Sequence, residues 1–302
     1  MTATPVIGVP AARTPARRFP TIGWIGLAIV GLFVVVAVAA PWISPYGPLE
    51  RAVQTVQAPS RHDLLGTNQI GQDILSQLIA GARVSLLMAV LAGGGSVLIG
   101  SVVGITAGWV GGWPDLVLMR LTDLFLAVPR LPLLVVVGTY AGRSFTALAL
   151  VIAAVFWPGT ARLLRGQIRS LRSRMHVRAA LGFGAGSLHI LRRHVVPDVG
   201  LLLVASLVGA AGRAILLEAG LAFLGLGDPS RTSWGSIMRD ARQSPGLFYT
   251  HYWTWWMLPP ITAIFVLLLG MTFLGVAVEQ RINPRLARHA RGPVPGALPR
   301  PT

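Results

Sequence analysis

The chain has 302 residues, of which 53% are hydrophobic and only 12% are charged, and its mean hydropathy is +0.66. A soluble domain of this size needs more charge on its surface, so the composition excludes an ordinary soluble protein. The formal net charge of +16 comes from 26 arginines without a lysine. Cysteine is absent as well, which excludes disulfides, thiolate metal sites and a cysteine nucleophile.

The missing lysine also limits how the chain can use ATP. A phosphate-binding P-loop requires a lysine beside its glycine-rich turn, so this sequence contains no standard P-loop site for hydrolysing a nucleoside triphosphate. Any work driven by ATP has to come from a partner. The arginines gather at the ends of the apolar runs, where they favour membrane orientation, so we expect no nucleic-acid partner.

Apolar runs predict six membrane-spanning segments, each near the length of about 20 residues that a helix needs to cross a bilayer. In chain order they cover residues 22–43, 84–108, 116–138, 144–163, 199–226 and 257–278. The first run contains Ala37-Val38-Ala39, which resembles a signal-peptidase site. It is longer than the apolar region of a signal peptide, so we predict a retained helix. The expected fold class is an all-α, polytopic integral membrane protein.

Three of these runs carry signs of close packing or bending. Small residues recur four apart in the second run, on one helical face, at Ser96, Gly100, Gly104 and Gly108. That spacing lets helices approach closely in lipid. Pro129-Arg130-Leu131-Pro132 interrupts the third run and Trp157-Pro158 the fourth. Because proline removes a backbone donor and kinks a helix, we expect broken spans at both places.

Charge asymmetry predicts the orientation. With six spans, a basic arm (1–20), the loop 161–194 and the tail 281–302 share one side, and together they hold sixteen arginines and no acidic residue. The loops 44–82 and 227–256 on the other side mix arginines with acids, and the second ends in an aromatic cluster typical of a membrane interface. Positive-inside logic therefore places both termini in the cytoplasm. The tail is expected to be a disordered extension.

Four ionisable residues inside or beside the apolar runs are candidates for a translocation pathway: Arg130, Asp123, Arg213 and Glu218. Such groups usually face a cavity or a partner. Arg130 could grip a carboxylate, such as a peptide C-terminus, with two hydrogen bonds. The alternative is an arginine whose head reaches interfacial water. For Arg213 and Glu218 the alternative is a structural contact with a neighbouring helix or a partner. The histidines at 176, 189 and 194 lack metal-site spacing, so no metal is expected.

The loop 161–194 holds eight arginines and no acid. From Val177 to Pro197 the sequence reads VRAALGFGAGSLHILRRHVVP. Its alanines favour a helix, its glycines break it, and Pro197 is typical of the start of the next helix. We expect a short helix across the membrane plane followed by a defined turn. The alternative is a solvated basic loop that touches lipid phosphates.

Ala179-Ala180, with Gly184 four residues on and Pro197 thirteen further, resembles the EAA loop of bacterial ABC importer permeases. The resemblance implies that residues 177–191 form a coupling helix that docks on a cytoplasmic ATPase. The implied contact residues are Arg178, Ala179, Ala180, Gly184, Ser187 and Pro197. Arg178 stands where the motif has glutamate, which replaces an acidic contact with a basic one.

Other stretches resemble the C-type subunit of dipeptide and oligopeptide permeases, and the resemblance runs from about Ala40 to Pro284. They are LGTNQIGQD (65–73), GARVSL (81–86), Met119-Arg120 with Asp123 and Pro129, Glu218-Ala219, FLGLG (223–227) and SWG (233–235). That group more often has Asp at position 68 and Arg at position 72, where this chain has Asn68 and Gln72.

The resemblance implies a type I ABC importer permease core over residues 81–280, preceded by the first span and outer loop at 21–80. It implies a non-catalytic subunit of the cell membrane that needs no cofactor, since ATP and Mg²⁺ belong to partner ATPase subunits. The other implied partners are a homologous second permease and an extracytoplasmic binding protein. The implied solute is a di- or oligopeptide or a similar compound.

The alternative function is a secondary carrier or channel in which Glu218, Arg213 and Asp123 form an ion or proton relay without ATPase partners. Carriers are often built from internal repeats, and none is visible here. A membrane assembly scaffold is a third, weaker hypothesis. The loop 161–194 separates these functions, because its detailed sequence matters only if it transmits force.

Overall fold

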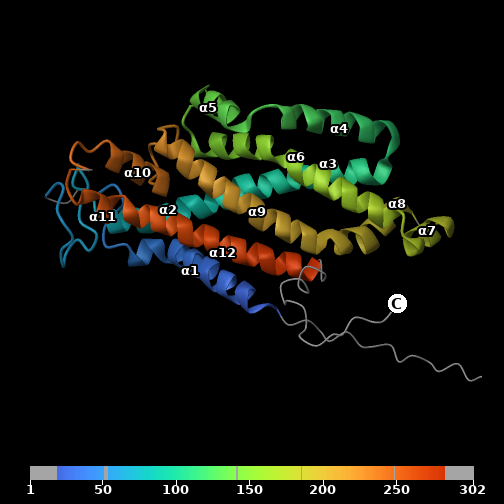
Figure 1. The fold of residues 1–302 in the computed structure, drawn as a ribbon, viewed down its shortest axis with the longest axis horizontal. Helices are drawn as coiled ribbons and strands as arrows, with labels where there is room; N and C mark the ends of the chain where they lie inside the picture. The colour runs from blue at the N-terminus through green and yellow to red at the C-terminus, as the bar shows by residue number, and fades with distance from the viewer. Residues whose placement is uncertain (1–18, 51–53, 141, 185, 248, 283–302) are drawn as a thin grey trace, which may run out of the picture.

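The computed structural model describes residues 19–50, 54–140, 142–184, 186–247 and 249–282. Nearly all of the predicted basic arm and of the predicted disordered tail lie outside these residues. The helical elements, in chain order, are α1 (Thr21–Ile43), α2 (Ile74–Met88), η1 (Ala89–Gly94), α3 (Gly95–Val110), α4 (Gly112–Ala127), α5 (Arg130–Tyr140), α6 (Phe145–Arg172), α7 (Met175–Gly182), α8 (Ser187–Ile190), η2 (Leu191–Val195), α9 (Val196–Phe223), α10 (Trp234–Arg242), α11 (Tyr252–Trp256) and α12 (Leu258–Ile282). Figure 1 shows them as an elongated bundle.

Five helical stretches are long and apolar enough to cross a membrane, and the bent pair α4–α5 makes a sixth if it counts as one broken span. The five are α1, the continuous run from α2 through η1 to α3, α6, α9 and the run from α11 to α12. No strand forms within the described residues. The prediction of a polytopic, all-α membrane protein is therefore confirmed.

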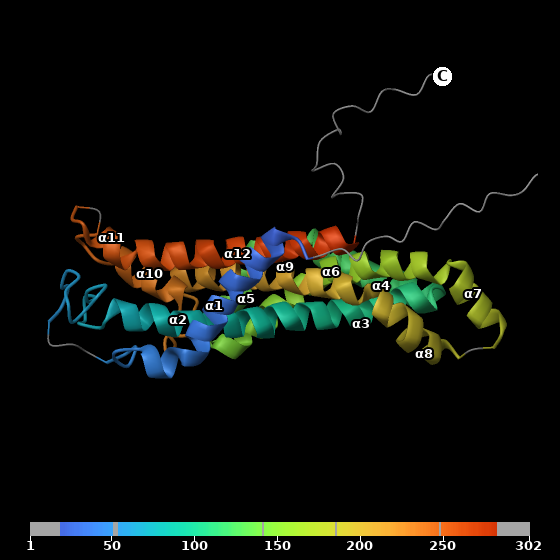
Figure 2. The same cartoon turned by 90° about the horizontal axis from the view of Figure 1, so that it is seen from below.

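The loops of the bundle separate into two ends, as alternating spans require. The segment 44–73, α10 and α11 lie at one end, and α7 and α8 lie at the other (Figure 2). The first residues of α1 and the last residues of α12 point towards the α7 end (Figure 1). The predicted outer loops thus lie together at one end, and the predicted coupling segment lies at the other end.

The predicted breaks at the two proline sites have different outcomes. Between α4 and α5 the chain turns by 86° at Val128–Pro129, so that break is confirmed. The second prediction is wrong, because α6 continues for 28 residues with Pro158 inside it. Neighbouring helices can offset the hydrogen bond that a proline removes. Here Trp157 and Pro158 are both buried, and Gly100 of α3 packs on the Trp157 backbone.

The small residues of the second run pack α3 tightly on α6. A Cβ added at Gly100 would lie 2.6 Å from the carbonyl oxygen of Trp157, and one at Gly104 would lie 2.5 Å from that of Ala161. At Gly108 it would meet the Ile168 side chain at 2.8 Å. The close approach that the four-residue spacing predicts is confirmed, and it extends over the length of α3.

A second close crossing joins α9 to η1, a π-helical stretch that was not predicted. A Cβ added at Gly93 would lie 2.8 Å from the Cα and N atoms of Ala211 on α9. Gly93 thus gives α9 a place where backbone meets backbone. A second π-helical stretch, η2, precedes α9 and joins it to α8 without a break in the helical run. Pro197 lies in the first turn of α9, as expected, but the helical run already begins with α8, so this proline does not start it.

Helix α10 fills the end of the bundle opposite α7 and α8. Trp234 is 1% exposed, and its Nε1 donates a hydrogen bond to the Leu78 carbonyl on α2 at 2.9 Å. The Trp234 indole also meets Phe33 of α1 edge-on, with ring centroids 5.6 Å apart. Behind it, Gly235 packs directly on the Ala219 backbone of α9. Trp234 therefore joins α1 to α2, and with Gly235 the start of α10 contacts three spans at this end.

Candidate functional site

The segment between α6 and α9 has a defined shape that its sequence only partly revealed. Helix α6 continues to Arg172, so the first third of the predicted loop 161–194 is helical. After a short turn, α7 begins at Met175 and ends at Gly182. Gly184 has φ +83°, which lets the chain reverse before α8. Non-glycine residues rarely adopt that backbone conformation, so the turn depends on this glycine.

Helix α7 is anchored through one face only. Val177 is 1% exposed and Ile190 is fully buried, and both pack in an apolar cluster with Leu164, Ile168 and Leu171 of α6. The remaining surface of α7 is free among the described residues. That surface carries two large apolar side chains, Met175 and Phe183, which are 87% and 92% exposed.

Five of the six residues that resemble the coupling motif are exposed: Arg178, Ala179, Gly184, Ser187 and Pro197. The sixth, Ala180, is half-buried. The structure therefore brings the motif to the surface of one end of the bundle. Met175 and Phe183 were not predicted as contact residues, although apolar side chains flanking two alanines in a basic loop are a recognisable signal of a contact surface.

Ion pairs between α4 and α6, which were not predicted, hold α4 against the end of α6 that precedes α7. Asp115 is 4% exposed and accepts two hydrogen bonds from Arg165, at 2.5 and 2.7 Å. Arg169 lies 3.4 Å from the same carboxylate. Towards the middle of the bundle, Asp123 pairs with Arg162 in an exposed contact. The arginine spacing of three to four residues on one face of α6 is the signal that could have revealed these contacts.

The four candidate pathway residues lie in different surroundings. Asp123 forms an ion pair with Arg162. Arg130 begins α5 and stacks its guanidinium 5.1 Å above the Phe156 ring. Arg213 lines a groove of about 430 Å³ between α9 and α12. Glu218 is buried.

Glu218 is enclosed by the helices that surround the last two turns of α9. It is 3% exposed, and its Oε2 has no hydrogen-bond partner among the described residues. None of the ion pairs in this part of the chain joins Glu218, Arg213 and Asp123 to one another. The three residues of the alternative relay are therefore not brought together.

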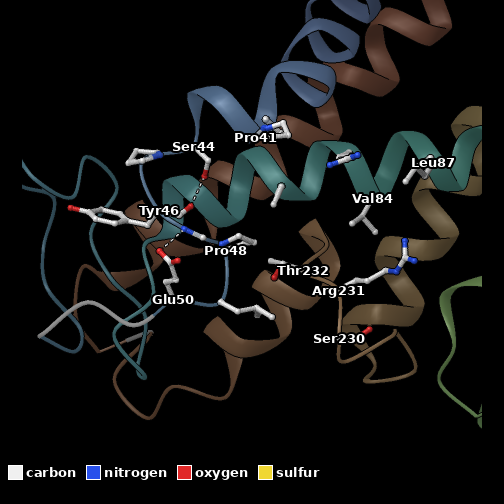
Figure 3. Close-up of a pocket in the computed structure, with 16 residues that line it drawn as sticks. Pro41, Ser44, Tyr46, Pro48, Glu50, Val84, Leu87, Ser230, Arg231 and Thr232 are labelled. Atoms are coloured by element: carbon white, nitrogen blue, oxygen red, sulfur yellow. Dashed lines mark hydrogen bonds between the residues drawn. The ribbon is translucent and has the colours of Figure 1, made fainter.

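The opposite end of the bundle contains a cavity of about 640 Å³ (Figure 3). Its walls are the end of α1 with residues 44–50, one face of α2, and residues 230–232. Arg83 and Arg231 supply positive charge, and Glu50 closes one side by accepting a hydrogen bond from the Gly47 amide at 2.8 Å. The cavity thus lies where the two outer loops meet.

Asp228 fixes the second of these loops. Its carboxylate accepts hydrogen bonds from the Phe145 amide at 3.1 Å and from the Ser230 amide and hydroxyl at 2.9 and 2.6 Å. Burial favours the neutral carboxyl, but these donors and the nearby Arg231 outweigh it and hold the pKa of Asp228 below its ordinary value. The charged aspartate therefore ties the loop after α9 to the start of α6.

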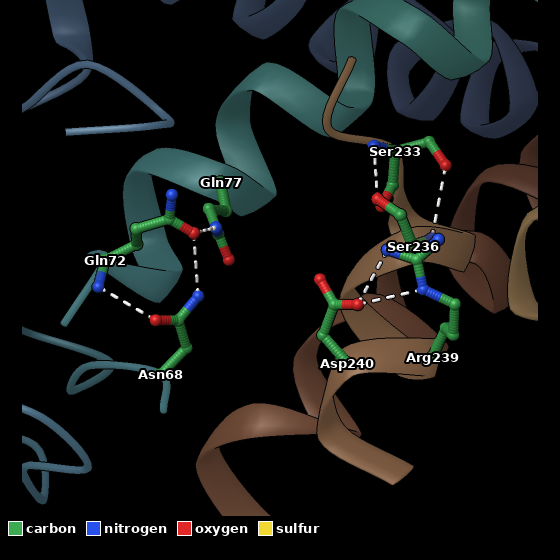
Figure 4. A network of polar contacts seen from close by, with 7 residues as sticks. All are labelled: Asn68, Gln72, Gln77, Ser233, Ser236, Arg239 and Asp240. Atoms are coloured by element: carbon green, nitrogen blue, oxygen red, sulfur yellow. Dashed lines mark hydrogen bonds and ion pairs between the residues drawn. The ribbon is translucent and has the colours of Figure 1, made fainter. Parts of the chain in front are cut away.

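Polar networks order the outer segments further (Figure 4). Asn68 donates to the Gln72 side chain at 2.9 Å, and Gln77 donates to the same oxygen at 2.7 Å. On the right of Figure 4, Ser233 and Ser236 form a reciprocal capping box at the start of α10. Asn68 and Gln72, two residues that the sequence comparison singled out as unusual, are thus partners in one contact.

Known proteins match this architecture along most of the chain. Residues 100–288 match the family described as binding-protein-dependent transport system inner membrane component. Residues 21–64 match the N-terminal transmembrane domain of oligopeptide transport permease C. The chain belongs to the first of these families. It is a multi-pass protein of the inner membrane, as predicted.

Individual relatives agree with this assignment. The chain is 34% identical over 262 residues to a protein of Brucella suis named as a peptide permease, with 86% of each chain covered. It is 33% identical over 285 residues to a peptide transport system permease of the same species, covering 94% of this chain and 93% of the relative. It is 30% identical over 264 residues to a dipeptide transport system permease of Alkalihalophilus pseudofirmus, covering 87% and 85%. The resemblance to peptide-type permeases is confirmed.

Proposed function

We propose that this protein is a non-catalytic permease subunit of an ATP-driven importer. It forms half of the translocation pathway for di- or oligopeptides or a similar solute, together with a homologous second permease. Cytoplasmic partner subunits bind ATP and Mg²⁺ and hydrolyse the nucleotide. A binding protein outside the cell delivers the solute to the outer end of the bundle, where the 640 Å³ cavity opens.

The observation that carries this proposal is the shape of the segment 175–190. Two short helices, α7 and α8, project from the end of the bundle. Helix α7 is anchored to α6, and α8 continues through η2 into α9. The two long helices have 28 residues each. Their inner face is held by Val177 and Ile190, and their outer face exposes Met175 and Phe183. A partner that grips this face can therefore move two spans at once.

The solute class is supported by two arginines and by the relatives. Arg130 begins α5 and Arg213 lies on α9, and neither joins an ion pair within the described residues. A guanidinium without a carboxylate partner can recognise a carboxylate with two hydrogen bonds. We propose that they receive the C-terminal carboxylate of a peptide, which agrees with the peptide and dipeptide permeases named among the relatives.

Replacing Gly184 with leucine tests the coupling role. The positive φ at Gly184 makes any larger residue strained by about 1–2 kcal/mol, so the turn after α7 should change shape. We expect Gly184→Leu to insert normally and to lose transport. A tagged wild-type chain should recover a second permease and P-loop ATPases from native membranes, identified by mass spectrometry, whereas the variant should lose the ATPases.

Gly182→Leu is the matched control, because it adds the same side chain two residues earlier, where φ is not positive and nothing lies within 4 Å. It should retain more transport than Gly184→Leu. The proposal fails if the purified chain transports alone after reconstitution, or if Gly184→Leu transports as well as wild type.

Replacing Glu218 with glutamine separates the importer from a secondary carrier. The carboxylate is buried without a described cation beside it, so an uncharged group of the same shape should keep the fold at least as stable. We expect Glu218→Gln to retain the melting temperature and most of the transport. Loss of transport in a well-folded Glu218→Gln protein would favour a proton or ion relay through this residue.

A further inference from the structure

A basic cavity of about 600 Å³ lies between the α3–α4 turn and α7, away from every residue proposed for the pathway. Its floor is the turn Gly111-Gly112, at which both residues have positive φ. Three arginines form its walls: Arg169 and Arg172 from the end of α6, and Arg178 from α7.

The positive charge in this cavity is poorly neutralised. Arg172 donates to the Trp109 carbonyl at 2.6 Å and stacks on the Trp109 ring, contacts that leave its charge intact. Arg169 is 3.4 Å from Asp115, but that carboxylate is already held in a closer, two-bonded contact by Arg165. Arg178 is exposed and joins none of the ion pairs found in the described residues. The cavity therefore favours an anion.

The rim of the cavity is apolar and faces outward from the bundle. Val110 lines it and is 53% exposed, and Trp113, directly after Gly112, is 76% exposed. Exposed tryptophan at the end of a span is typical of the membrane interface. Because this rim joins the end of α3 to the start of α4, we expect it to lie at the depth where headgroups meet acyl chains.

We infer that this cavity binds the headgroup phosphate of an anionic phospholipid, with the acyl chains along Val110 and Trp113. Basic pockets between helices at the cytoplasmic side are suited to such headgroups. A carboxylate from a soluble partner fits less well, because the cavity lies on the side of α7 that faces the α3–α4 turn. The bound lipid would bridge α7 to the ends of α3 and α4, and this role does not require the proposed ATPase coupling.

Lipid titration of the purified full-length chain tests the inference. Phosphatidylglycerol and phosphatidylcholine with identical acyl chains are added in mild detergent, and bound lipid is counted by native mass spectrometry. Phosphatidylglycerol should bind more tightly to the wild type. Arg178→Gln should weaken it roughly fivefold, the contribution of one arginine near a lipid surface.

Arg192→Gln is the matched control, because Arg192 is an exposed arginine of the neighbouring η2 stretch that does not line the cavity. It removes the same charge and should leave phosphatidylglycerol affinity within about twofold of wild type. Equal weakening by both variants would overturn the inference, because net charge would then explain the binding. Equal affinity for phosphatidylcholine would overturn it too.

Two further outcomes also count against a lipid. Displacement of the lipid by millimolar inorganic phosphate would identify a site for free anions. Release of the lipid when ATPase subunits assemble with the chain would assign the three arginines to a protein contact. Retention of phosphatidylglycerol under both conditions, with Arg178→Gln still weaker than Arg192→Gln, supports the lipid site.

Discussion

Replacing Gly104 with leucine is expected to prevent the assembly of the bundle. A Cβ at this position would lie 2.5 Å from the Ala161 carbonyl oxygen and 3.0 Å from the Ala161 Cα. Both are backbone atoms of α6, so the contact is relieved only if the two helices move apart. Overpacking typically costs about 1–3 kcal/mol when side chains can adjust, and we expect a larger loss here. Size-exclusion chromatography in detergent should show aggregated or degraded protein.

Gly166→Leu is the control for this change. Gly166 lies on α6 and is exposed, and a Cβ added there would meet nothing within 4 Å, so the same side chain should be accepted. The expected result is a monodisperse Gly166→Leu protein with a melting temperature near that of wild type. A stable Gly104→Leu protein would mean that α3 and α6 do not pack as closely as the structure shows.

The glycine spacing also marks how far the sequence alone could go. Small residues four apart predict that α3 packs closely on another helix, and this is confirmed. They do not identify the partner, because the contact at Gly104 is made with Ala161, far away along the chain. The partner becomes known only from the three-dimensional arrangement of the spans.

The two proline sites show the same limit. Pro129 and Pro158 each lack a backbone N–H donor, and the sequence predicts a break in the helix at both. Only the first is broken, since it joins α4 and α5, which bury few of their residues. Pro158 lies in a helix that packs on α3 along its length. Tertiary contact decides whether a proline ends a helix, and the local sequence does not contain that information.

In the candidate site as well, features within one short segment could be predicted from the sequence, and contacts between distant segments could not. The motif Ala179-Ala180 with Gly184 lies in one continuous segment, so the sequence could reveal both its helix and its turn. The contact between Asp115 and Arg165 joins residues fifty positions apart, so their pairing stayed hidden. Asn68 and Gln72 look like two departures from the related permeases when read singly, and the structure shows that they satisfy each other.

Replacing Asp115 with alanine should destabilise the protein more than any other change of a charged residue between α4 and α6. The Asp115 carboxylate is 6% exposed, and its removal leaves Arg165, 28% exposed, without its partner. Removing one member of a buried ion pair typically costs about 3–5 kcal/mol. Because Arg165 retains some contact with water, we expect a loss near the lower end of that range, measured as a lowered melting temperature in detergent.

Asp123→Ala provides the comparison on the same two helices. Its pair with Arg162 has side chains that are 51% and 58% exposed, and exposed pairs contribute at most about 1 kcal/mol. The double variant Asp115→Ala with Arg165→Gln should recover part of the stability lost by Asp115→Ala, because it removes the uncompensated charge. Equal effects of Asp115→Ala and Asp123→Ala would contradict this account. In that case the buried pair would not be what fastens α4 to the end of α6 from which α7 projects.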